Sequence, residues 1–355
     1  MTFEHTKILY LCGDLSLIGG IEKYNLDFIS AINSSGAKVK SIQRKAGGIR
    51  SKFFFVFHFI VSVFTFRPSH IICAHLHFSP LVLFISKILK IKYSLSIYGI
   101  EAMEINNKIY RNALIQAKKI IVISEYTKNL VNSQFNFSSS KYFMLISSVS
   151  EKNNYIIEDI SSLKNKYGFG DGPIVLTISR KSSTEKKGQH RVVNAFNEVL
   201  KKFPSSKYVM AGPGADERIN EAIESNPNTA ESIIDLGLVS EEQRRELYNL
   251  CDVFVLPSKN EGFGIVFIEA LACGAQVIAS NGYGCKEGLL NGALGSVVDP
   301  EDTKELAYTI NDALEKSKTR TLKDRWRIRN LTIEIYGYDT WCKKVLNYLV
   351  EIGSN

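Results

Sequence analysis

Two carboxylates separated by seven residues, Glu261 and Glu269, have types and spacing that suit a sugar-like ligand. A helix is predicted to begin near Gly264, so Glu261 would reach a ligand from a loop and Glu269 from about two turns into that helix. Two acceptors at different depths suit the two hydroxyl-bearing ends of one molecule, such as a sugar and a ribose. The alternative is a helix N-terminus whose glutamates only face solvent.

The backbone between these glutamates is the second part of the predicted site. Gly262 and Gly264 flank Phe263 and let the chain approach a ligand closely. The N–H groups of the first helical turn have no partner within the helix, so they can bind an anion or a hydroxyl. We therefore include Phe263, Gly264 and Ile265 among the candidate donor-binding residues.

Two cations follow another predicted strand. Arg180 comes directly after Ile174–Ser179, and Lys187 stands just before a helix predicted from Gln189. A guanidinium binds phosphate in a fork and an ammonium adds a point charge. A helix N-terminus next to both favours a diphosphate. Lys186 is a rival for the lysine role, and an exposed basic loop is the alternative.

Two glycine turns also follow predicted strands. Gly19-Gly20 opens a helix and could turn backbone amides toward a phosphate, although the dinucleotide spacing G-x-G-x-x-G is absent. Gly212, in Gly212-Pro213-Gly214, could border the base of a nucleotide. Plain turns are the alternative for both.

A third set of polar residues lies in the first half of the chain. His75 and His77 follow the predicted strand Ile71–Ala74, and alternation places them on one face, where imidazoles could bind hydroxyls. Zinc would need further ligands that the sequence does not offer nearby. A packed, structural pair is the alternative. Tyr98 and Glu101 follow the next strand and are candidates for binding an acceptor.

Strands and helices must alternate twice to position these residues. The predicted strands are 7–12, 71–74, 94–98, 120–124, 174–179, 207–211, 233–236, 253–256, 276–279 and 294–298. The predicted helices are 21–34, 80–89, 105–118, 126–134, 189–203, 241–250, 266–273, 303–316 and 338–352. Such alternation with apolar strands indicates parallel sheets covered on both faces, whose ligands bind at the carboxyl ends of the strands.

Length and composition indicate two ordinary globular domains. The chain has 355 residues, with 45% hydrophobic and 23% charged residues. We expect an N-terminal acceptor-binding domain at 1–150, a linker at 151–172, a donor-binding domain at 173–335 and a C-terminal helix at 336–355 that packs back toward the first domain. The six cysteines form no C-x-x-C pair and indicate reduced, mostly buried thiols of a cytosolic protein.

The net charge of +8 favours anionic partners. The apolar run Phe53–Phe66 is shorter than a bilayer span when helical, and a buried helix is the first interpretation. The alternative is a face that dips into a membrane surface, since basic residues flank the run. We expect no nucleic acid partner.

Together these residues resemble the large retaining glycosyltransferase family called group 1 or family 4, over nearly the whole chain and most strongly from Ile174 to Pro300. The resemblance implies the α/β GT-B fold, with two Rossmann-like doubly wound domains facing across a cleft. It implies that Arg180 and Lys187 neutralise the donor diphosphate, Glu269 holds the ribose and Glu261 holds the transferred sugar. Gly19 and Gly20 would approach the phosphates.

Two features depart from the family. The stretch from Arg180 to Lys187 is two residues longer than the family's, which is why Lys186 is a rival, and one position differs in residue type. Tyr98 stands where the family often has histidine, and a phenol cannot act as a base at neutral pH. Any catalytic duty there would pass to His75 or His77.

The implied function is transfer of a hexose-type sugar, with retention, from a nucleotide-sugar to a glycan acceptor, which we expect to be lipid-linked, in polysaccharide biosynthesis of the O-antigen or capsule kind. No Asp-x-Asp sequence is present, so no divalent metal cofactor is expected. The expected location is the cytoplasm, at the inner face of the plasma membrane. The alternatives are a GT-B sugar-nucleotide epimerase and a non-catalytic protein that binds a nucleotide-sugar.

Overall fold

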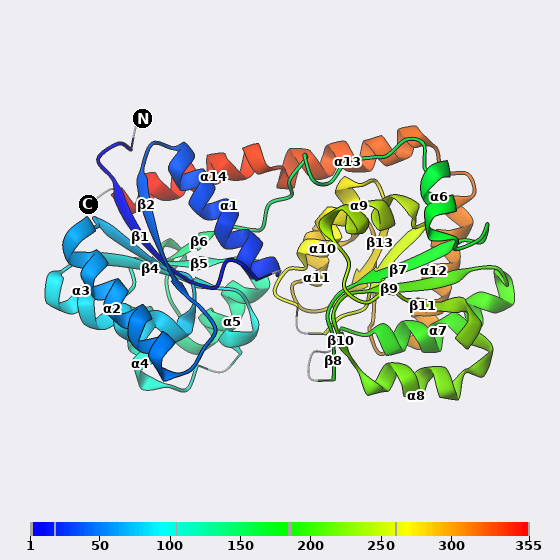
Figure 1. The fold of residues 1–355 in the computed structure, drawn as a ribbon, viewed down its shortest axis with the longest axis horizontal. Helices are drawn as coiled ribbons and strands as arrows, with labels where there is room; N and C mark the ends of the chain where they lie inside the picture. The colour runs from blue at the N-terminus through cyan, green and yellow to red at the C-terminus, as the bar shows by residue number, and fades with distance from the viewer. Residues whose placement is uncertain (1–2, 18, 104, 184–186, 260, 354–355) are drawn as a thin grey trace. The chain divides into compact units, whose positions relative to one another are not determined.

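The computed structural model describes residues 3–17, 19–103, 105–183, 187–259 and 261–353. The chain divides into two compact units, one formed by residues 1–148 and 339–355 and the other by residues 149–338. Each unit is a parallel sheet covered by helices (Figure 1). Residues 151–172, assigned above to a linker, fall within the second unit and include helix α6, Ser161–Tyr167.

The sheet of unit 1 has six parallel strands in the order β2-β1-β3-β4-β5-β6. Their bounds are Lys7–Gly13, Lys38–Arg44, His70–Cys73, Lys92–Ile97, Lys119–Val122 and Tyr142–Met144, numbered β1 to β6. The order reverses between β1 and β3, so the loops that follow these two strands diverge there. The edge strands β2 and β6 were not predicted from the sequence.

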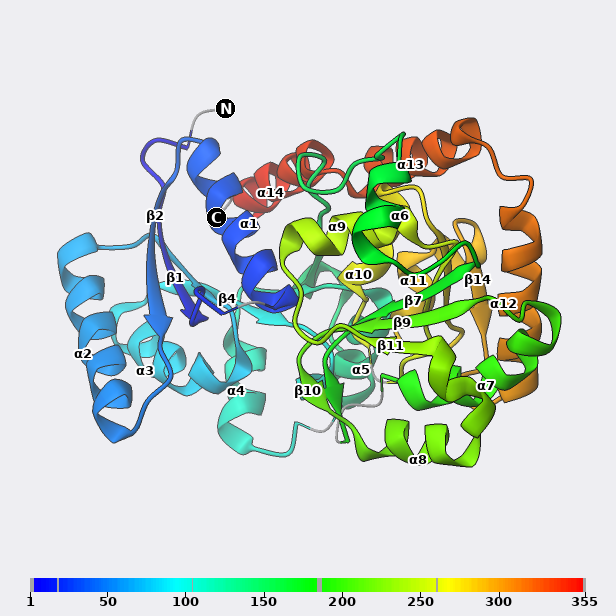
Figure 2. The same ribbon diagram turned by 45° about the vertical axis from the view of Figure 1, so that its right-hand side comes forward.

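Helices cover both faces of this sheet (Figure 2). One face packs on α2, α3, α4 and α5, because Phe59, Val82, Leu114 and Val131 share one core cluster with alternate strand residues. The other face carries Tyr10, which packs on Phe28 of α1, and Phe28 contacts Trp341 and Tyr348 of the C-terminal helix. The bounds are α1 Gly20–Ser34, α2 Ile49–Phe66, α3 Ser79–Leu89, α4 Lys108–Gln116, α5 Glu125–Phe135 and α14 Tyr338–Gly353.

Helix α2 corrects one prediction. The apolar run Phe53–Phe66 is helical, but it is not a buried helix. Phe55, Phe59, Ser62 and Val63 are the buried residues of α2, and most of its other side chains face solvent. A helix with only one side against the core buries few of its residues, however apolar its sequence is. Of the described helices, α2 is the one long and apolar enough to cross a membrane.

The sheet of unit 2 also has six parallel strands, in the order β11-β9-β7-β12-β13-β14. This is the strand order 3-2-1-4-5-6 of the doubly wound nucleotide-binding fold, with the reversal between β7 and β12. The bounds are β7 Ile174–Ile178, β9 Lys207–Ala211, β11 Ile233–Asp235, β12 Val253–Leu256, β13 Gln276–Ser280 and β14 Ser296–Val298. Two short strands, β8 Lys181–Ser182 and β10 Gly214–Ala215, pair outside this sheet.

One face of the unit 2 sheet packs on α7, α8 and α12, through a cluster that joins Phe196, Ile219 and Leu306 to Val175 and Val255. The opposite face packs on α9 and α10, where the Phe254 ring meets the rings of Tyr248 and Phe267. The bounds are α7 Gln189–Lys202, α8 Glu217–Ser225, α9 Glu241–Leu250, α10 Ile265–Ala272, α11 Cys285–Gly288, α12 Thr303–Ser317 and α13 Leu322–Tyr336. Helices α6, α8, α11 and α13 were not predicted.

Candidate functional site

An ion pair joins the two loops that flank the strand reversal of unit 2. Lys187 Nζ lies 2.7 Å from Glu261 Oε1, and both side chains are mostly buried. Lys187 belongs to the segment after β7, and Glu261 to the loop after β12. Open α/β sheets bind ligands at such a reversal, outside the carboxyl ends of the strands. Two of the predicted site residues therefore meet at the place where the topology favours a ligand.

Close backbone contacts hold these loops in place. Gly188, with a φ of +90°, is the N-terminal cap of α7 and lies against the loop after β12, since a Cβ on it would lie 2.4 Å from the carbonyl oxygen of Pro257. A Cβ on Gly284 would lie 2.0 Å from the carbonyl oxygen of Gly262. The Gly284 N–H also donates to the carbonyl oxygen of Glu261, at 2.9 Å. These backbone contacts fix the position of the loop that carries Glu261.

Glu269 faces two side chains of α9. Its carboxylate is 1% exposed, its Oε2 lies 3.7 Å from Arg244 Nε, and the Tyr248 hydroxyl donates to the same oxygen at 3.4 Å. Burial lowers the pKa of Arg244 and the Glu269 carboxylate raises it, with a net rise. Because α10 begins at Ile265, Glu269 lies little more than one turn into the helix, rather than the two turns predicted.

Arg180 and Gly212 lie beside one another at the backbone. A Cβ on Gly212, whose φ is +129°, would lie 2.1 Å from the carbonyl oxygen of Ser179, so the turn after β9 packs directly on the chain that leads to Arg180. The Arg180 side chain is exposed. Gln189 supports this corner, because its Nε2 donates to Ser179 Oγ at 2.7 Å and to the Arg180 carbonyl at 3.2 Å.

The first turn of α10 lies next to Glu261 in the chain. Phe263 is 2% exposed and packs edge-on against the Tyr336 ring, which anchors the loop in the core. Gly264 is the N-terminal cap and has a φ of +87°, a conformation that favours glycine. A glycine cap has no side-chain acceptor for the first-turn amides that begin at Ile265, and the Phe267 N–H donates to the Gly264 carbonyl oxygen at 3.1 Å.

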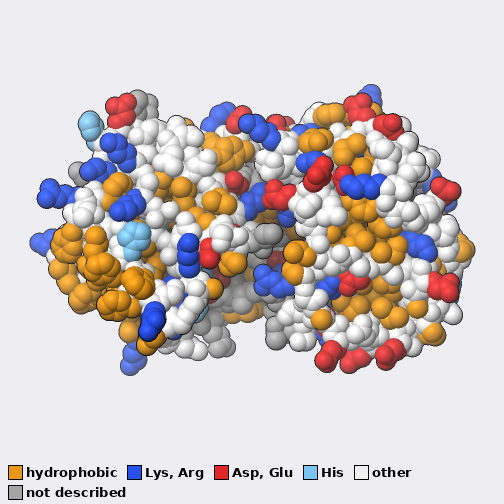
Figure 3. Space-filling model, viewed as in Figure 1, with side chains coloured by type: hydrophobic (Ala, Val, Ile, Leu, Met, Phe, Trp, Pro, Cys, Tyr) orange, Lys and Arg blue, Asp and Glu red, His pale blue; other side chains and the backbone are white. Residues whose placement is uncertain are grey.

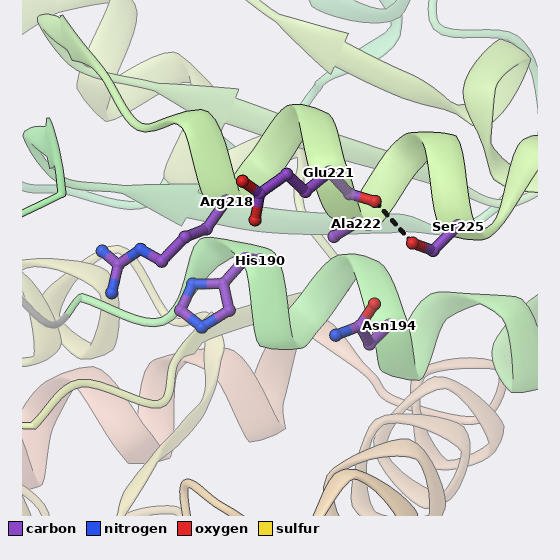
Figure 4. Close-up of a pocket in the computed structure, with 6 residues that line it drawn as sticks. All are labelled: His190, Asn194, Arg218, Glu221, Ala222 and Ser225. Atoms are coloured by element: carbon purple, nitrogen blue, oxygen red, sulfur yellow. Dashed lines mark hydrogen bonds between the residues drawn. The ribbon is translucent and has the colours of Figure 1, made fainter.

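Unit 2 has a separate hollow between α7 and α8 (Figure 4). It has a volume of about 240 Å³ and is lined by His190, Asn194, Arg218, Glu221, Ala222 and Ser225. None of the predicted site residues lines it. Arg218 forms an ion pair with Asp216, with its Nη2 2.6 Å from Asp216 Oδ2. We assign no role to this hollow.

The strand reversal of unit 1 also carries predicted residues. Gly19 is the N-terminal cap of α1 after β1, and a Cβ on it would lie 2.1 Å from Glu22 Oε2. The Glu22 carboxylate therefore lies over the turn that Gly19 and Gly20 form. His75 follows the neighbouring strand β3. The two loops thus belong to the two strands that flank the reversal.

The two histidines form a pair with a defined proton arrangement. His75 Nδ1 accepts the backbone N–H of His77 at 3.2 Å, so it is the acceptor of its ring. His77 Nδ1 lies 3.0 Å from the same atom and must donate to it. Burial first, and His77 second, lowers the pKa of His75 to about 4. At neutral pH His75 is therefore uncharged and presents an Nε2–H donor rather than a base.

Tyr98 lies in the core of unit 1. It is 7% exposed, and its hydroxyl donates to Asn25 Oδ1 at 2.8 Å, an atom that also accepts from the Tyr10 hydroxyl at 2.6 Å. Burial raises the pKa of Tyr98 far above its ordinary value. Its backbone N–H donates to Glu101 Oε1 at 2.6 Å, and burial raises the pKa of Glu101. Glu101, predicted as a candidate for binding an acceptor, thus binds the backbone of its own loop.

Arg244 is the residue at this site that the sequence analysis missed. It belongs to α9 and reaches Glu269 of α10 across the face of the sheet. Its place after the capping-box residue Ser240 predicts a solvent-facing helix start, so the sequence offered little sign of this contact.

Lys186, the rival to Lys187, lies outside the described residues. Within the described ranges no three His, Cys, Asp or Glu side chains are grouped as a metal site would need.

The cysteines agree with the sequence analysis. All six are free thiols, and five of them are buried. Burial raises the pKa of Cys73 and Cys285 to about 12, which keeps both as neutral, unreactive thiols.

A family model matches part of the chain. Residues 159–327, almost all of unit 2, match the model of the glycosyl transferases group 1. The match therefore relates unit 2 to the glycosyl transferases group 1. The predicted resemblance to group 1 is confirmed over these residues.

Curated relatives match parts of the chain. It is 30% identical over 159 residues to the "GDP-mannose-dependent alpha-(1-6)-phosphatidylinositol monomannoside mannosyltransferase" of Mycolicibacterium smegmatis, covering 43% of this chain and 41% of that one. It is 29% identical over 242 residues to the "N,N'-diacetylbacillosaminyl-diphospho-undecaprenol alpha-1,3-N-acetylgalactosaminyltransferase" of Campylobacter jejuni, covering 66% and 56%. The chain thus spans about half the length of these relatives.

Solved structures extend the likeness to both units. The sucrose-phosphate synthase of Thermosynechococcus elongatus superposes with a TM-score of 0.83 at 18% identity, covering 98% of this chain and 99% of that one. Anabaena HepE, solved with UDP and glucose, gives a TM-score of 0.77 at 18% identity, covering 98% and 100%. At this identity the likeness shows the fold, and the predicted GT-B class is confirmed.

Proposed function

We propose that this chain is a glycosyltransferase that moves a hexose-type sugar from a nucleotide-sugar held by unit 2. The observation that carries the proposal is the Lys187–Glu261 ion pair at the strand reversal of a group 1 domain. It places a cation beside a hydroxyl acceptor, at 2.7 Å, and a sugar bonded to a diphosphate needs one group of each kind.

The donor-side roles follow from charge and depth. Lys187 and the exposed Arg180 would stabilise the charge that grows on the diphosphate as the sugar–phosphate bond opens. Glu261 would accept sugar hydroxyls, helped by the first-turn amides of α10. Glu269, held by Arg244 and Tyr248, would accept the ribose hydroxyls.

The acceptor side is assigned to unit 1. The Nε2–H of His75 is a hydrogen-bond donor suited to a hydroxyl or a glycan oxygen, with His77 fixing its tautomer. Names of relatives specify a phosphatidylinositol mannoside and a diphospho-undecaprenol acceptor. They support a lipid-linked glycan acceptor. We further propose transfer with retention and a role in assembling a cell-surface polysaccharide, at a cytoplasmic location.

The donor nucleotide is tested by thermal stability. UDP-, GDP-, ADP- and CMP-sugars, GDP-mannose included, are added separately, and the true donor should raise the melting temperature through mass action. Lys187→Ala should lose this shift, whereas Lys304→Ala, an exposed lysine of α12, should keep it. A panel with no shift for any nucleotide-sugar would contradict donor binding. Product analysis then separates sugar transfer from epimerisation of the donor.

We also propose that transfer needs no divalent metal ion, because Lys187 and Arg180 supply the positive charge at the diphosphate. Turnover should persist in a chelator. Loss of turnover that magnesium restores would reverse this part of the proposal.

A further inference from the structure

Helix α2 turns an apolar face to solvent. Phe53, Phe57, Ile60 and Phe64 recur at the three- and four-residue spacing that places side chains on one side of a helix. Three of these rings are among the most exposed apolar groups of unit 1, with 70%, 56% and 59% of Phe53, Phe57 and Phe64 accessible. Exposed apolar groups gathered in this way mark an interaction surface.

The last turns of α3 add to this surface. Phe84 and Ile88, four residues apart, are 62% and 58% exposed. Helices α2 and α3 cover the same face of the sheet, because both contribute side chains to one core cluster. Phe55 of α2 also packs against Phe78, the residue before α3, at a ring distance of 5.0 Å. Hydrophobic side chains gather over α2, with Lys and Arg side chains around them (Figure 3).

The charge around this surface has one sign. Residues 28–100 contain ten Lys and Arg and neither Asp nor Glu. Since the whole chain carries +8, the remaining residues together carry −2. Seven of the ten are exposed near α2 and α3, and in the described part of the chain none of them forms an ion pair. They are Lys45, Arg50, Lys52, Arg67, Lys87, Lys90 and Lys92.

The charge decides which partner fits. A second copy of the chain would bring the same cationic surface against itself, which costs energy. An acidic protein would match the charge, but the phenylalanines would then need a complementary groove. An anionic lipid bilayer offers both a negative surface for the lysines and arginines and an acyl boundary for the rings.

The opposite face of α2 fixes its orientation. Phe55, Phe59 and Val63 are buried in the core of unit 1, so the folded helix cannot pass through a bilayer. A helix attached by one face and apolar on the other lies in the plane of an interface. We propose that α2 and the last turns of α3 dock unit 1 on the surface of an anionic lipid bilayer.

Tryptophan emission tests this insertion in the full chain. Phe57→Trp should shift its emission to shorter wavelength with vesicles of phosphatidylcholine and phosphatidylglycerol, and much less with phosphatidylcholine alone. Wild-type spectra supply the background of Trp326 and Trp341. Tyr308→Trp, at a 74% exposed position of α12, should show no shift. Equal shifts for both variants would overturn the proposal.

Flotation with the same vesicles measures affinity. Phe57→Glu should weaken partition by more than about tenfold, because a buried ring is lost and a like charge faces the lipid. Lys87→Glu combined with Lys90→Glu should weaken it by about tenfold or more, and high salt should do the same. Tyr308→Glu and Lys304→Glu are the controls and should float as the wild type does.

Three outcomes would overturn the proposal. The wild type could fail to float with anionic vesicles at low salt, or Phe57→Glu could float equally well. Sedimentation could instead reveal a dimer that Phe57→Glu disperses without any flotation, which would assign the surface to self-association. Vesicle binding needs no nucleotide-sugar, so its failure is distinguishable from failure of the thermal-shift test of the donor site.

Discussion

Lys187 Nζ contacts Glu261 Oε1 across the strand reversal of unit 2, at 2.7 Å. The two residues are 74 positions apart in the chain, and the parallel order β7-β12 brings their loops together. The pair places a cation and a carboxylate at one edge of the sheet. Substituting one residue at a time should therefore distinguish the roles of the two side chains.

Lys187→Ala should lower turnover with the donor by about a hundredfold or more, because a charge that stabilises the leaving diphosphate is removed. Glu261→Gln keeps the shape of the side chain and should also lower turnover, with a weaker loss of nucleotide affinity. Initial rates at saturating donor measure both effects.

The control for these two variants is Lys304→Ala, on the exposed side of α12. It should keep wild-type rates. Urea unfolding of all three variants shows whether the fold is intact, and near-wild-type turnover of a folded Lys187→Ala protein would refute the assigned role.

Gly284→Ala should destabilise unit 2 by about 1–3 kcal/mol, because its Cβ would lie 2.0 Å from the Gly262 carbonyl oxygen. Gly282→Ala is the matched control, since no heavy atom lies within 4 Å of its Cβ position. It should change stability by less than about 0.5 kcal/mol. The urea concentrations at the unfolding midpoint measure both effects. Equal midpoints for the two variants would show that the loop moves to accommodate the methyl group without a loss of stability.

The stability of unit 1 should fall as the pH drops from about 6.5 to 4. The folded chain holds His75 neutral, with its pKa lowered to about 4, while the unfolded chain binds a proton below the ordinary value of 6.5. The unfolded state therefore gains more protons in this window, and below pH 4 the contribution of His75 stops changing.

His75→Gln should reduce this pH dependence, because the amide oxygen can accept the His77 N–H without titrating. Buried His70, whose pKa is lowered to about 3, acts in the same direction and should leave a residual slope. Urea unfolding at successive pH values gives the slope, and an identical slope in the variant would contradict the assignment.

Tyr98→Phe should cost about 1 kcal/mol, the contribution of one hydrogen bond to Asn25. Asn25→Ala should cost more, because the Tyr98 and Tyr10 hydroxyls would both lose their acceptor inside the core. Chemical denaturation compares the two. Tyr98→Phe costing as much as Asn25→Ala would show that the two tyrosines do not share the acceptor in solution.

The sequence predicted the strands that carry the site, because their residues are continuously apolar between glycine-rich turns. It missed β2, in which Val39 and Ile42 are the two apolar residues among seven, since an edge strand is half solvated. It also missed the Arg244–Glu269 contact, which depends on how α9 and α10 pack rather than on any local pattern.

The surface of α2 shows a different limit. Hydrophobicity predicts a helix there, but the sequence does not say that its core contact would use only Phe55, Phe59 and Val63 among its large apolar residues. The net charge of +8 describes the chain as a whole and conceals the acid-free stretch 28–100, which a local count reveals. The pKa of His75 depends on burial and on the neighbouring His77 ring, and neither effect can be predicted from the sequence alone.

The aromatic packing of α14 has a consequence for how the protein is made. Trp341 and Tyr348 complete the core that Phe28 began, although all of unit 2 lies between them in the chain. During synthesis, residues 149–338 must leave the ribosome before unit 1 can close. Unit 2 can therefore fold first, while the earlier-translated half stays incomplete until α14 has been made.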